Sequence, residues 1–333
     1  MNSSAKLQSR PVNFSRSFST SGQHSVRSAG TALVALLVLL TGCGERNSAR
    51  VAERPTAWFA GGDLPTYLDC ARENQVTLIQ AHRAGPGPGL AENSLGAISA
   101  SLAAGALFLE IDVGKTADGT LVLLHDDTLE RTTTGSGTLQ SVSDRDLQSL
   151  RLLDPRGRVL DEGIPTLAEA LEHLDGRGVA QIDIKIGVSS RQLAQELRRA
   201  DALDRVIIIS YSVAAAIAFH RQEPRALISV GIDGPAELKE LEDAGINLDQ
   251  LSIWLGLGSG RPALDRQLAD LGVETSYGDF AAERRGTASY RQMARNGAEI
   301  ISVDDVDAAT RALDANTESR NLLEACTQAR GGA

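Results

Sequence analysis

The sequence predicts an α/β protein whose main domain is a closed (β/α)8 TIM barrel with a subdomain inserted after the second strand. Short apolar, β-prone runs alternate with amphipathic stretches of helical spacing, which is the pattern of parallel strands joined by crossover helices. Eight such units favour a closed barrel over an open doubly wound sheet, and no glycine fingerprint of a dinucleotide site follows the first run. Of the 333 residues, 42% are hydrophobic and only 4% are aromatic, which suits helices packed on short buried strands.

The N-terminal segment has the pattern of a secretion signal. Residues 31–40 form an apolar run that is too short to span a bilayer but has the length of the hydrophobic region of a signal peptide, and three arginines precede it. The LTGC sequence that ends at Cys43 resembles the lipobox of bacterial lipoproteins, which implies cleavage before Cys43 and a diacylglycerol group on its side chain. We therefore expect a signal peptide over residues 1–42 and a lipid-anchored tether over 43–65. A buried apolar segment with a chance cysteine is the alternative.

The expected anchor and the charge of the chain bear on location and partners. An anchored domain would face the periplasm from the cell envelope, and Gly44 in place of an aspartate resembles lipoproteins that are sorted to the outer membrane. The formal net charge is −10, and no block rich in arginine or lysine overrides it, so the molecule repels polyanions. The expected partners are a small-molecule substrate and a membrane, reached through the anchor, but not nucleic acid.

We expect the barrel domain over residues 66–330, with a cysteine near each end. Cys70 and Cys326 lie near its two ends, and the ends of a closed barrel meet, so a disulfide between them is expected in a compartment that permits one. Two unrelated buried thiols are the alternative. The eight barrel strands are expected at residues 76–81, 107–112, 179–184, 205–210, 226–230, 250–254, 272–276 and 298–303.

A ninth apolar run, residues 121–126, follows the second strand too closely for a crossover helix and must return antiparallel to it. Asp118-Gly119 carries the signal of a two-residue hairpin turn, which would pair Lys115 with Val122 and Val113 with Leu124. That register places His125 opposite Asp112, although a one-residue bulge would shift it. Residues 127–178 then form a long insertion before the third barrel strand, with a helical stretch at 166–174, and long insertions of this kind are often lids or binding loops.

Polar residues follow the apolar strands at corresponding places, where barrel enzymes hold their active sites. Glu110 and Asp112 end the second strand and point to the same face because they are two residues apart, and Asp183 ends the third barrel strand. Three converging carboxylates would repel one another unless a hard divalent cation with oxygen ligands neutralised them. The sequence therefore predicts a site for Mg²⁺ or Ca²⁺, and no set of His and Cys at zinc spacing appears.

Two cations and two histidines accompany this predicted metal site. Arg83 and Lys185 would hold a phosphoryl group beside the carboxylates. His82 and His125 would divide the roles of general acid and general base near neutral pH. Taken singly, a histidine at a strand end is more often a structural hydrogen-bonding group, but their joint placement favours catalysis. The remaining histidines, His24, His173 and His220, lie in the leader or in helical stretches and are interpreted as surface or structural residues.

These residues also carry a resemblance to the glycerophosphodiester phosphodiesterase family, which covers about residues 77–307 and is strong to about 185. The resemblance implies a barrel, a divalent metal, and hydrolysis of glycerophosphodiesters to glycerol 3-phosphate and an alcohol. By motif position it implies that His82 and His125 are the acid–base pair, that Glu110, Asp112 and Asp183 bind the metal, and that Arg83 and Lys185 contact phosphate. Glu92 and Asn93 match the Glu-Asn of the family and are expected to support the site. The matching segments are AHRAG (81–85), AENS (91–94), LEIDVGKTADGTLVLLHDDTLERTT (109–133), IPTLAEAL (164–171) and IDIK (182–185).

The chain departs from the family pattern in places, and two rival functions stay open. The third carboxylate, commonly Glu, is Asp183, and the Trp-Thr-x-Asn expected on the seventh strand is absent. Tyr277 or Trp254 is a candidate aromatic wall for a glycerol backbone, or else part of the core. One rival is a lipid-headgroup phosphodiesterase acting on lysophospholipid or phosphoinositide substrates with the same histidine pair. The other is a catalytically silent lipoprotein that binds a phosphorylated headgroup.

Overall fold

The computed structural model describes residues 64–331 of the 333-residue chain. The expected signal peptide, Cys43 and nearly all of the expected tether lie outside the described residues. Within that described part, no helix is both long enough and apolar enough to cross a membrane.

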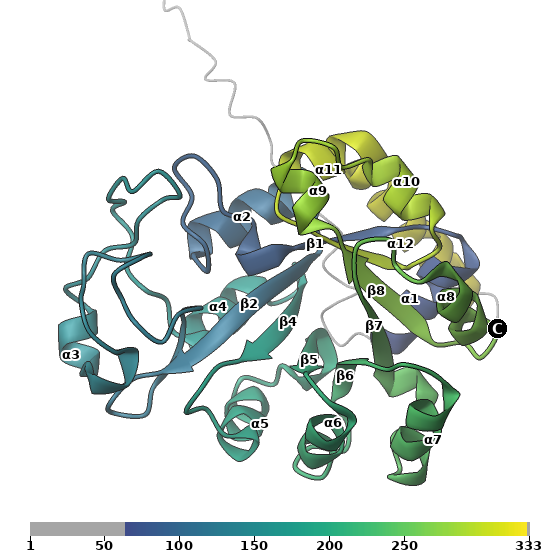
Figure 1. Ribbon diagram of the computed structural model, residues 1–333, viewed down its shortest axis with the longest axis horizontal. Helices are drawn as coiled ribbons and strands as arrows, with labels where there is room; N and C mark the ends of the chain where they lie inside the picture. Colours follow the sequence, from purple (N-terminus) through teal and green to yellow (C-terminus); the bar gives the residue numbers. More distant parts are fainter. Residues whose placement is uncertain (1–63, 332–333) are drawn as a thin grey trace, which may run out of the picture. The chain divides into compact units, whose positions relative to one another are not determined.

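The described residues form a closed barrel, as the sequence predicted (Figure 1). Neighbouring barrel strands pair in parallel in the order β1-β9-β8-β7-β6-β5-β4-β2, and a further pairing of β1 with β2 closes the ring. The barrel strands are β1 (Leu78–Ala81), β2 (Phe108–Lys115), β4 (Val179–Ile184), β5 (Val206–Ser210), β6 (Leu227–Gly231), β7 (Leu251–Leu257), β8 (Glu274–Gly278) and β9 (Ile300–Val303).

Helices surround the strands, and side-chain caps fix where several of them begin. Ser94, Ser189 and Ser212 each accept a hydrogen bond from a first-turn amide, and Thr166 forms a capping box with Glu169. The helices are α1 (Leu64–Glu73), α2 (Leu95–Ala104), α3 (Asp144–Leu147), α4 (Leu167–Leu174), α5 (Ser190–Arg199), α6 (Val213–His220), α7 (Pro235–Asp243), α8 (Pro262–Ala269), α9 (Phe280–Arg284), α10 (Tyr290–Arg295), α11 (Val306–Leu313) and α12 (Ala315–Gly331).

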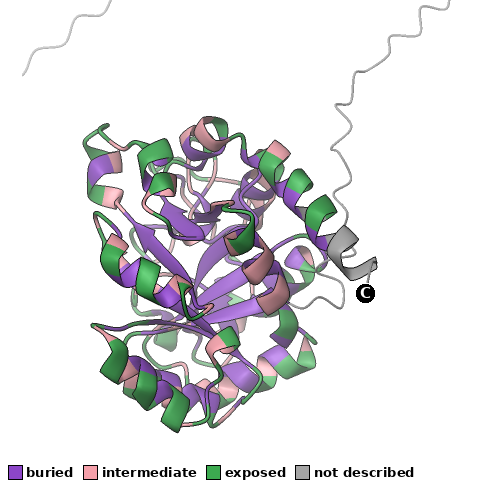
Figure 2. Ribbon diagram, turned by 90° about the vertical axis from the view of Figure 1, so that its right-hand side faces the viewer, coloured by how far each residue is buried: buried purple, intermediate pink, exposed green. Residues whose placement is uncertain are grey.

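The alternation of side chains along the strands builds two apolar layers. One set of strand residues, such as Ile111 and Ile182, packs outward against the helices. The other set, such as Phe108 and Val179, packs inside the barrel against Tyr67 and Leu68 of α1 at the amino-terminal ends of the strands. Figure 2 shows the resulting pattern of buried strands and helices that are exposed on their outer faces. The carboxyl ends of the strands are therefore left for polar side chains.

The hairpin after β2 forms, but its predicted register is wrong by one residue. β3 (Leu121–Leu123) runs antiparallel to β2 and pairs Val113 with Leu123 and Lys115 with Leu121. The turn has three residues instead of two, because the Thr116 amide donates to the Thr120 carbonyl (3.0 Å) and Gly119 adopts a φ of +92°. Leu124, rather than His125, consequently lies opposite Asp112, and its amide donates to the Asp112 carbonyl (3.0 Å).

The segment between β3 and α4 has an apolar cluster of its own, which includes Leu129, Leu139 and Leu152. It is tied to the loop that joins β1 to α2 and to the first turn of α2. The carboxylate of Asp154 accepts a hydrogen bond from the Gly89 amide, and that of Glu162 accepts one from the Gly96 amide (both 2.9 Å). The inserted segment thus supports the loop that carries several candidate site residues.

The predicted disulfide between Cys70 and Cys326 is confirmed. It joins α1 to α12, with 6.0 Å between the two Cα atoms and 256 residues between them in sequence. It therefore connects the two ends of the barrel domain, as the meeting of barrel ends predicted.

Glu299, just before β9, should make stability depend on pH. Its side chain is buried, accepts a hydrogen bond from the Thr275 amide (2.8 Å), and has its pKa raised by burial from 4.5 to about 7. The folded state therefore holds this proton more tightly than the unfolded state, and stability falls as pH rises from about 4.5 to 7. We expect Glu299→Gln to remove roughly 2 kcal/mol of the difference in unfolding free energy between pH 5 and pH 8.

Urea unfolding at both pH values measures this effect. Glu274, whose pKa burial raises to about 8, acts in the same direction, so the variant should keep part of the pH dependence. Glu240→Gln, on an exposed position of α7, is the control and should leave the pH dependence unchanged. An identical pH dependence in wild type and Glu299→Gln would contradict the prediction.

Candidate active site

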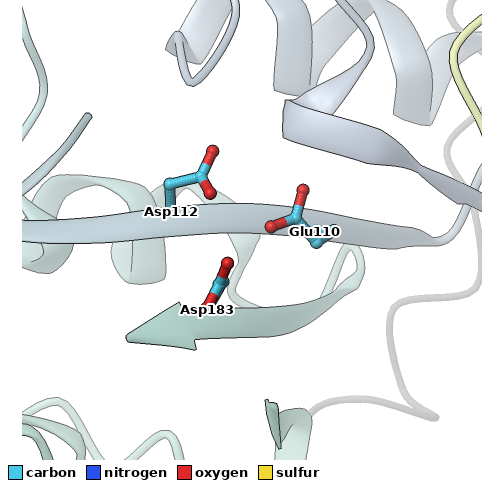
Figure 3. Close-up of side chains that lie close together, drawn as sticks. All are labelled: Glu110, Asp112 and Asp183. Carbon is cyan, nitrogen blue, oxygen red and sulfur yellow. The ribbon is translucent and has the colours of Figure 1, made fainter. Parts of the chain in front are cut away.

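Three carboxylates converge at the carboxyl end of the barrel. Glu110 and Asp112 lie on β2 and point into the barrel with Phe108, while Asp183 lies on the neighbouring β4, where its backbone pairs with that of Asp112. All three side chains are buried, and each offers an oxygen within 4.8 Å of the others (Figure 3). The three carboxylates that the sequence predicted to converge therefore do lie together.

Two neighbouring groups orient the carboxylates of Asp112 and Asp183. The Lys185 ammonium lies 2.7 Å from Asp112 Oδ1 and 2.6 Å from Asp183 Oδ2. The Tyr211 hydroxyl donates to the same Asp183 Oδ2 (2.6 Å). Sequence reasoning missed Tyr211, although it directly follows β5 and so occupies the same kind of strand-end position as the predicted residues.

The donor set fits a hard divalent cation. Among the described residues, buried Asp183 Oδ1 has no hydrogen-bond partner, while its other oxygen is fully engaged. Burial and the charge of Asp112 raise the pKa of Glu110 well above its ordinary value, and a cation bound beside the three carboxylates would favour its ionised form. Oxygen ligands with an unpaired buried lone pair are the chemistry that Mg²⁺ and Ca²⁺ accept.

The loop after β1 directs a backbone amide toward the carboxylate cluster. Arg83, Ala84 and Gly85 all have positive φ values, of +50°, +64° and +81°, and a Cβ at position 85 would overlap Ser101 Oγ. This turn lets the Arg83 amide donate to Glu110 Oε2 (2.7 Å). The Arg83 guanidinium reaches Glu92, with Nη1 3.3 Å from Oε2, and its buried Nε has no partner among the described residues.

His82 lies between an acidic partner and the carboxylate cluster. Its Nδ1 is 2.7 Å from Asp304 Oδ1, and its Nε2 is 4.0 Å from Glu110 Oε2. The ring of Phe280 stacks on the imidazole with 4.5 Å between ring centroids. Because the Asp304 carboxylate accepts a hydrogen bond from Nδ1–H, the other ring nitrogen, Nε2, faces the carboxylate cluster.

His125 joins the other residues through a chain of ion pairs. Its Nδ1 is 2.6 Å from Asp126 Oδ1, and Asp126 is held by Arg131, whose Nε lies 2.6 Å from Oδ2. Arg131 also pairs with Glu92 (2.7 Å), which in turn contacts Arg83. Asp126 and Arg131 lie in the segment 109–133 that resembles the family, but the sequence alone did not indicate a role for either residue.

Comparison with known proteins finds similar sequences and structures. A model of the glycerophosphoryl diester phosphodiesterase family matches residues 82–240. A glycerophosphodiester phosphodiesterase of Caldanaerobacter subterraneus subsp. tengcongensis is 34% identical over 146 residues, which are 41% of this chain and 58% of that protein. Glycerophosphodiester phosphodiesterase 1 of Rattus norvegicus is 42% identical over 97 residues, which are 27% of this chain and 28% of that protein.

A similar solved structure extends the likeness to the whole barrel. The crystal structure of a glycerophosphoryl diester phosphodiesterase from Parabacteroides distasonis matches with a TM-score of 0.69 and 27% identity, over 75% of this chain and 91% of that chain. Residues 82–240 are thus similar to the glycerophosphoryl diester phosphodiesterase family, and the barrel is similar to that of a solved structure named for the same activity. The family match over residues 82–240 contains the predicted catalytic histidines, the three carboxylates, Arg83 and Lys185. The chain spans 58% and 28% of the length of the two curated relatives named above.

The C-terminal third of the barrel decides between the two interpretations of Tyr277. Tyr277 is fully buried, and its hydroxyl donates to the Met293 carbonyl (2.8 Å) on the helix side of β8, so Tyr277 is part of the core and not an aromatic wall. Trp254 on β7 is half-buried. The interpretation of His173 and His220 as structural agrees with their surroundings, since His173 contacts Ser99 Oγ (2.7 Å) and His220 is buried at the end of α6.

The Glu-Asn pair of the family has distinct partners here. Asn93, buried with a φ of +58°, donates from Nδ2 to Asp112 Oδ2 (2.6 Å) and accepts at Oδ1 from the Asp112 amide (2.9 Å). Glu92 instead links Arg83 to Arg131. Asn93 therefore fixes both the backbone and the carboxylate of Asp112.

Asn93→Ala should destabilise the protein and disturb the carboxylate cluster. The change leaves the buried Asp112 amide without its acceptor, which costs about 1–3 kcal/mol of unfolding free energy. Urea unfolding measures the loss, with the exposed Asn74→Ala as control. Equal stability of Asn93→Ala and wild type would show that the two hydrogen bonds contribute nothing net.

Proposed function

We propose that this protein is a glycerophosphodiester phosphodiesterase that hydrolyses glycerophosphodiesters to glycerol 3-phosphate and an alcohol, with His82 and His125 as the acid–base pair. One observation carries the proposal. Nδ1 of each histidine contacts the carboxylate of an aspartate. Both contacts lie at the end of the barrel that also holds the three buried carboxylates. Such an arrangement leaves Nε2 of both rings for proton transfer. The names of the relatives, which are glycerophosphodiester phosphodiesterases, support the same substrate class.

The residues of the site have different roles in the proposed reaction. Arg83 and Lys185 bind the phosphoryl oxygens and offset their charge. One histidine accepts the proton of the attacking oxygen, and the other donates a proton to the departing alkoxide. The attacking oxygen belongs to water or to a neighbouring hydroxyl of the substrate; in the second case a cyclic phosphate forms, which water then opens.

The proposal includes a divalent cation. Glu110, Asp112 and Asp183 would hold Mg²⁺ or Ca²⁺, with Asp183 Oδ1 free to serve as a ligand. When bound, such a cation stabilises negative charge on the phosphoryl oxygens. Asn93, Lys185 and Tyr211 would not bind the cation, but their hydrogen bonds orient the carboxylates of Asp112 and Asp183.

A second candidate function acts on lipids. Ile186, Tyr211 and Leu257 are 70%, 78% and 69% exposed, and they lie at the carboxyl ends of β4, β5 and β7. Exposed apolar groups beside the candidate active site favour a substrate that carries an acyl chain. The lipid-headgroup phosphodiesterase is therefore the alternative, with the same histidine pair.

³¹P NMR of the purified protein with Mg²⁺ or Ca²⁺ separates these functions. Glycerophosphocholine and lysophosphatidylcholine are supplied in parallel. Release of glycerol 3-phosphate from the first substrate supports the proposal, and cleavage of the second alone supports the lipid alternative. Binding of both without cleavage would leave the silent binding lipoprotein.

We further propose that the chain is a lipoprotein of the cell envelope. Residues 1–42 would be its signal peptide, Cys43 its lipidated residue and 43–65 the tether to a domain over 66–330, facing the periplasm from the outer membrane. Mass spectrometry of the protein from cells tests this. A mature N-terminus at an acylated Cys43, lost in Cys43→Ser, is expected; an unmodified Cys43 with residues 1–42 retained would contradict it.

A further inference from the structure

Arg131 forms an unusual number of directed contacts for a half-exposed side chain. Its Nε and Nη2 donate to the two oxygens of Asp126 (2.6 and 2.8 Å). Its Nη1 and Nη2 donate to the two oxygens of Glu92 (both 2.7 Å). One guanidinium thus makes a bidentate pair with each of two carboxylates, which come from segments 34 residues apart, at positions 92 and 126.

Each of these carboxylates touches a residue with a proposed role in the reaction. Asp126 Oδ1 lies 2.6 Å from His125 Nδ1, and Glu92 Oε2 lies 3.3 Å from Arg83 Nη1. Because the guanidinium is a rigid planar fork, it fixes the two carboxylates relative to each other. Arg131 therefore sets the position of an acid–base group relative to a phosphate-binding group.

The charges of this network agree with that geometry. The hydrogen bonds from Arg131 lower the pKa of Asp126, and, although burial opposes it, they also lower the pKa of Glu92. The same two carboxylates raise the pKa of Arg131. Both carboxylates are thus ionised acceptors at neutral pH, and without Arg131 the Asp126 carboxylate would lose its main partner besides His125.

We propose that Arg131 is a positioning residue for the reaction. Through Asp126 it keeps the proton of His125 on Nδ1 and presents Nε2 to the substrate, and through Glu92 it orients Arg83. The inference rests on the proposed function, since it assigns Arg131 a part in the same site. It extends the site into the inserted segment after β3.

Steady-state kinetics of Arg131→Met and Arg131→Lys test the proposal. We expect Arg131→Met to lower kcat by about 10- to 100-fold, as is typical when a partner that orients a functional group is lost, and to raise KM by a smaller factor of about 2 to 5. Arg131→Lys should have the melting temperature of the wild type but not its kcat, because an ammonium cannot make four directed bonds. The control is Arg158→Met, an arginine of the same segment that pairs with Asp154 (2.7 Å). It should keep kcat within about twofold.

A purely structural role would give a different result. A drop in melting temperature with unchanged kcat in Arg131→Met would overturn the proposal, as would full recovery of kcat in Arg131→Lys.

¹H–¹⁵N NMR of the histidine rings provides a readout that needs no turnover. In the wild type, the His125 signal, identified by its loss in His125→Ala, should show a protonated Nδ1, and Arg131→Met should shift the population toward the other tautomer. An unchanged tautomer would overturn the proposal even if the proposed hydrolysis itself were absent. Absence of hydrolysis in the wild type, with the tautomer shift present, would instead count against the proposed function alone.

Discussion

His125→Ala is expected to lower kcat for a glycerophosphodiester by about 10³-fold, within the range that general acid–base groups contribute. The substitution removes the ring nitrogen that exchanges a proton with the substrate. His82→Ala should have an effect of the same order, because its Nε2 faces the carboxylate cluster while Asp304 holds Nδ1. Both rings are partly exposed, so the fold should survive either change.

Three observations check this prediction together. Values of kcat are measured for each variant, circular dichroism confirms that each is folded, and His173→Ala serves as the control. His173 lies on α4 and contacts Ser99 and Arg177, away from the proposed chemistry, so its loss should change kcat by less than about twofold. A His125→Ala variant with kcat close to that of the wild type would remove this residue from the mechanism.

Loss of the divalent cation should have the other large effect. A chelator is expected to abolish hydrolysis, since Glu110, Asp112 and Asp183 would otherwise hold the ion beside the phosphoryl group. Binding should also stabilise the folded state, by about 2.7 kcal/mol at a concentration 100 times the dissociation constant. Asp183→Asn should lose both effects, because it removes one of the converging charges and leaves an amide where Asp183 Oδ1 was free to bind.

Thermal unfolding with and without Mg²⁺ or Ca²⁺ measures this binding independently of activity. The control is Asp249→Asn, on an exposed position before β7, which should respond to the ion as the wild type does. A metal-induced rise in melting temperature that persists in Asp183→Asn would place the ion elsewhere.

The barrel and its polar strand ends could be predicted from sequence because both follow from local patterns. Short runs that are mostly apolar, such as 179–184, are bounded by helical stretches, and this pattern indicates parallel strands. Glu110 and Asp183 stand out because a charge within such a run needs a partner or a function. Parallel strands then bring their carboxyl ends to one edge, so the cluster follows without knowledge of the tertiary structure.

The register error and the open choice at Tyr277 arose where the local pattern was ambiguous. Asp118-Gly119 is compatible with a two-residue or a three-residue turn, and the difference of one residue changed the partner of Asp112. β8 has the sequence ETSYG, which lacks a clear apolar alternation, so the side of the strand on which Tyr277 lies was not evident.

Other residues of the site depend on contacts that sequence spacing does not encode. Asp304 meets His82 only because β9 closes the barrel beside β1, with 222 residues between them. Arg131 meets Glu92 only because the inserted segment folds against the loop after β1. Such partners are found from tertiary structure, whereas the groups that they orient were visible in the sequence.

A crystal structure of the protein with Ca²⁺ and glycerol 3-phosphate would test the central claim most directly. We predict that the cation lies among the carboxylates of Glu110, Asp112 and Asp183, and that the phosphate contacts Arg83 and the Nε2 atoms of His82 and His125. A phosphate bound away from both histidines, or a cation bound outside the three carboxylates, would contradict the account.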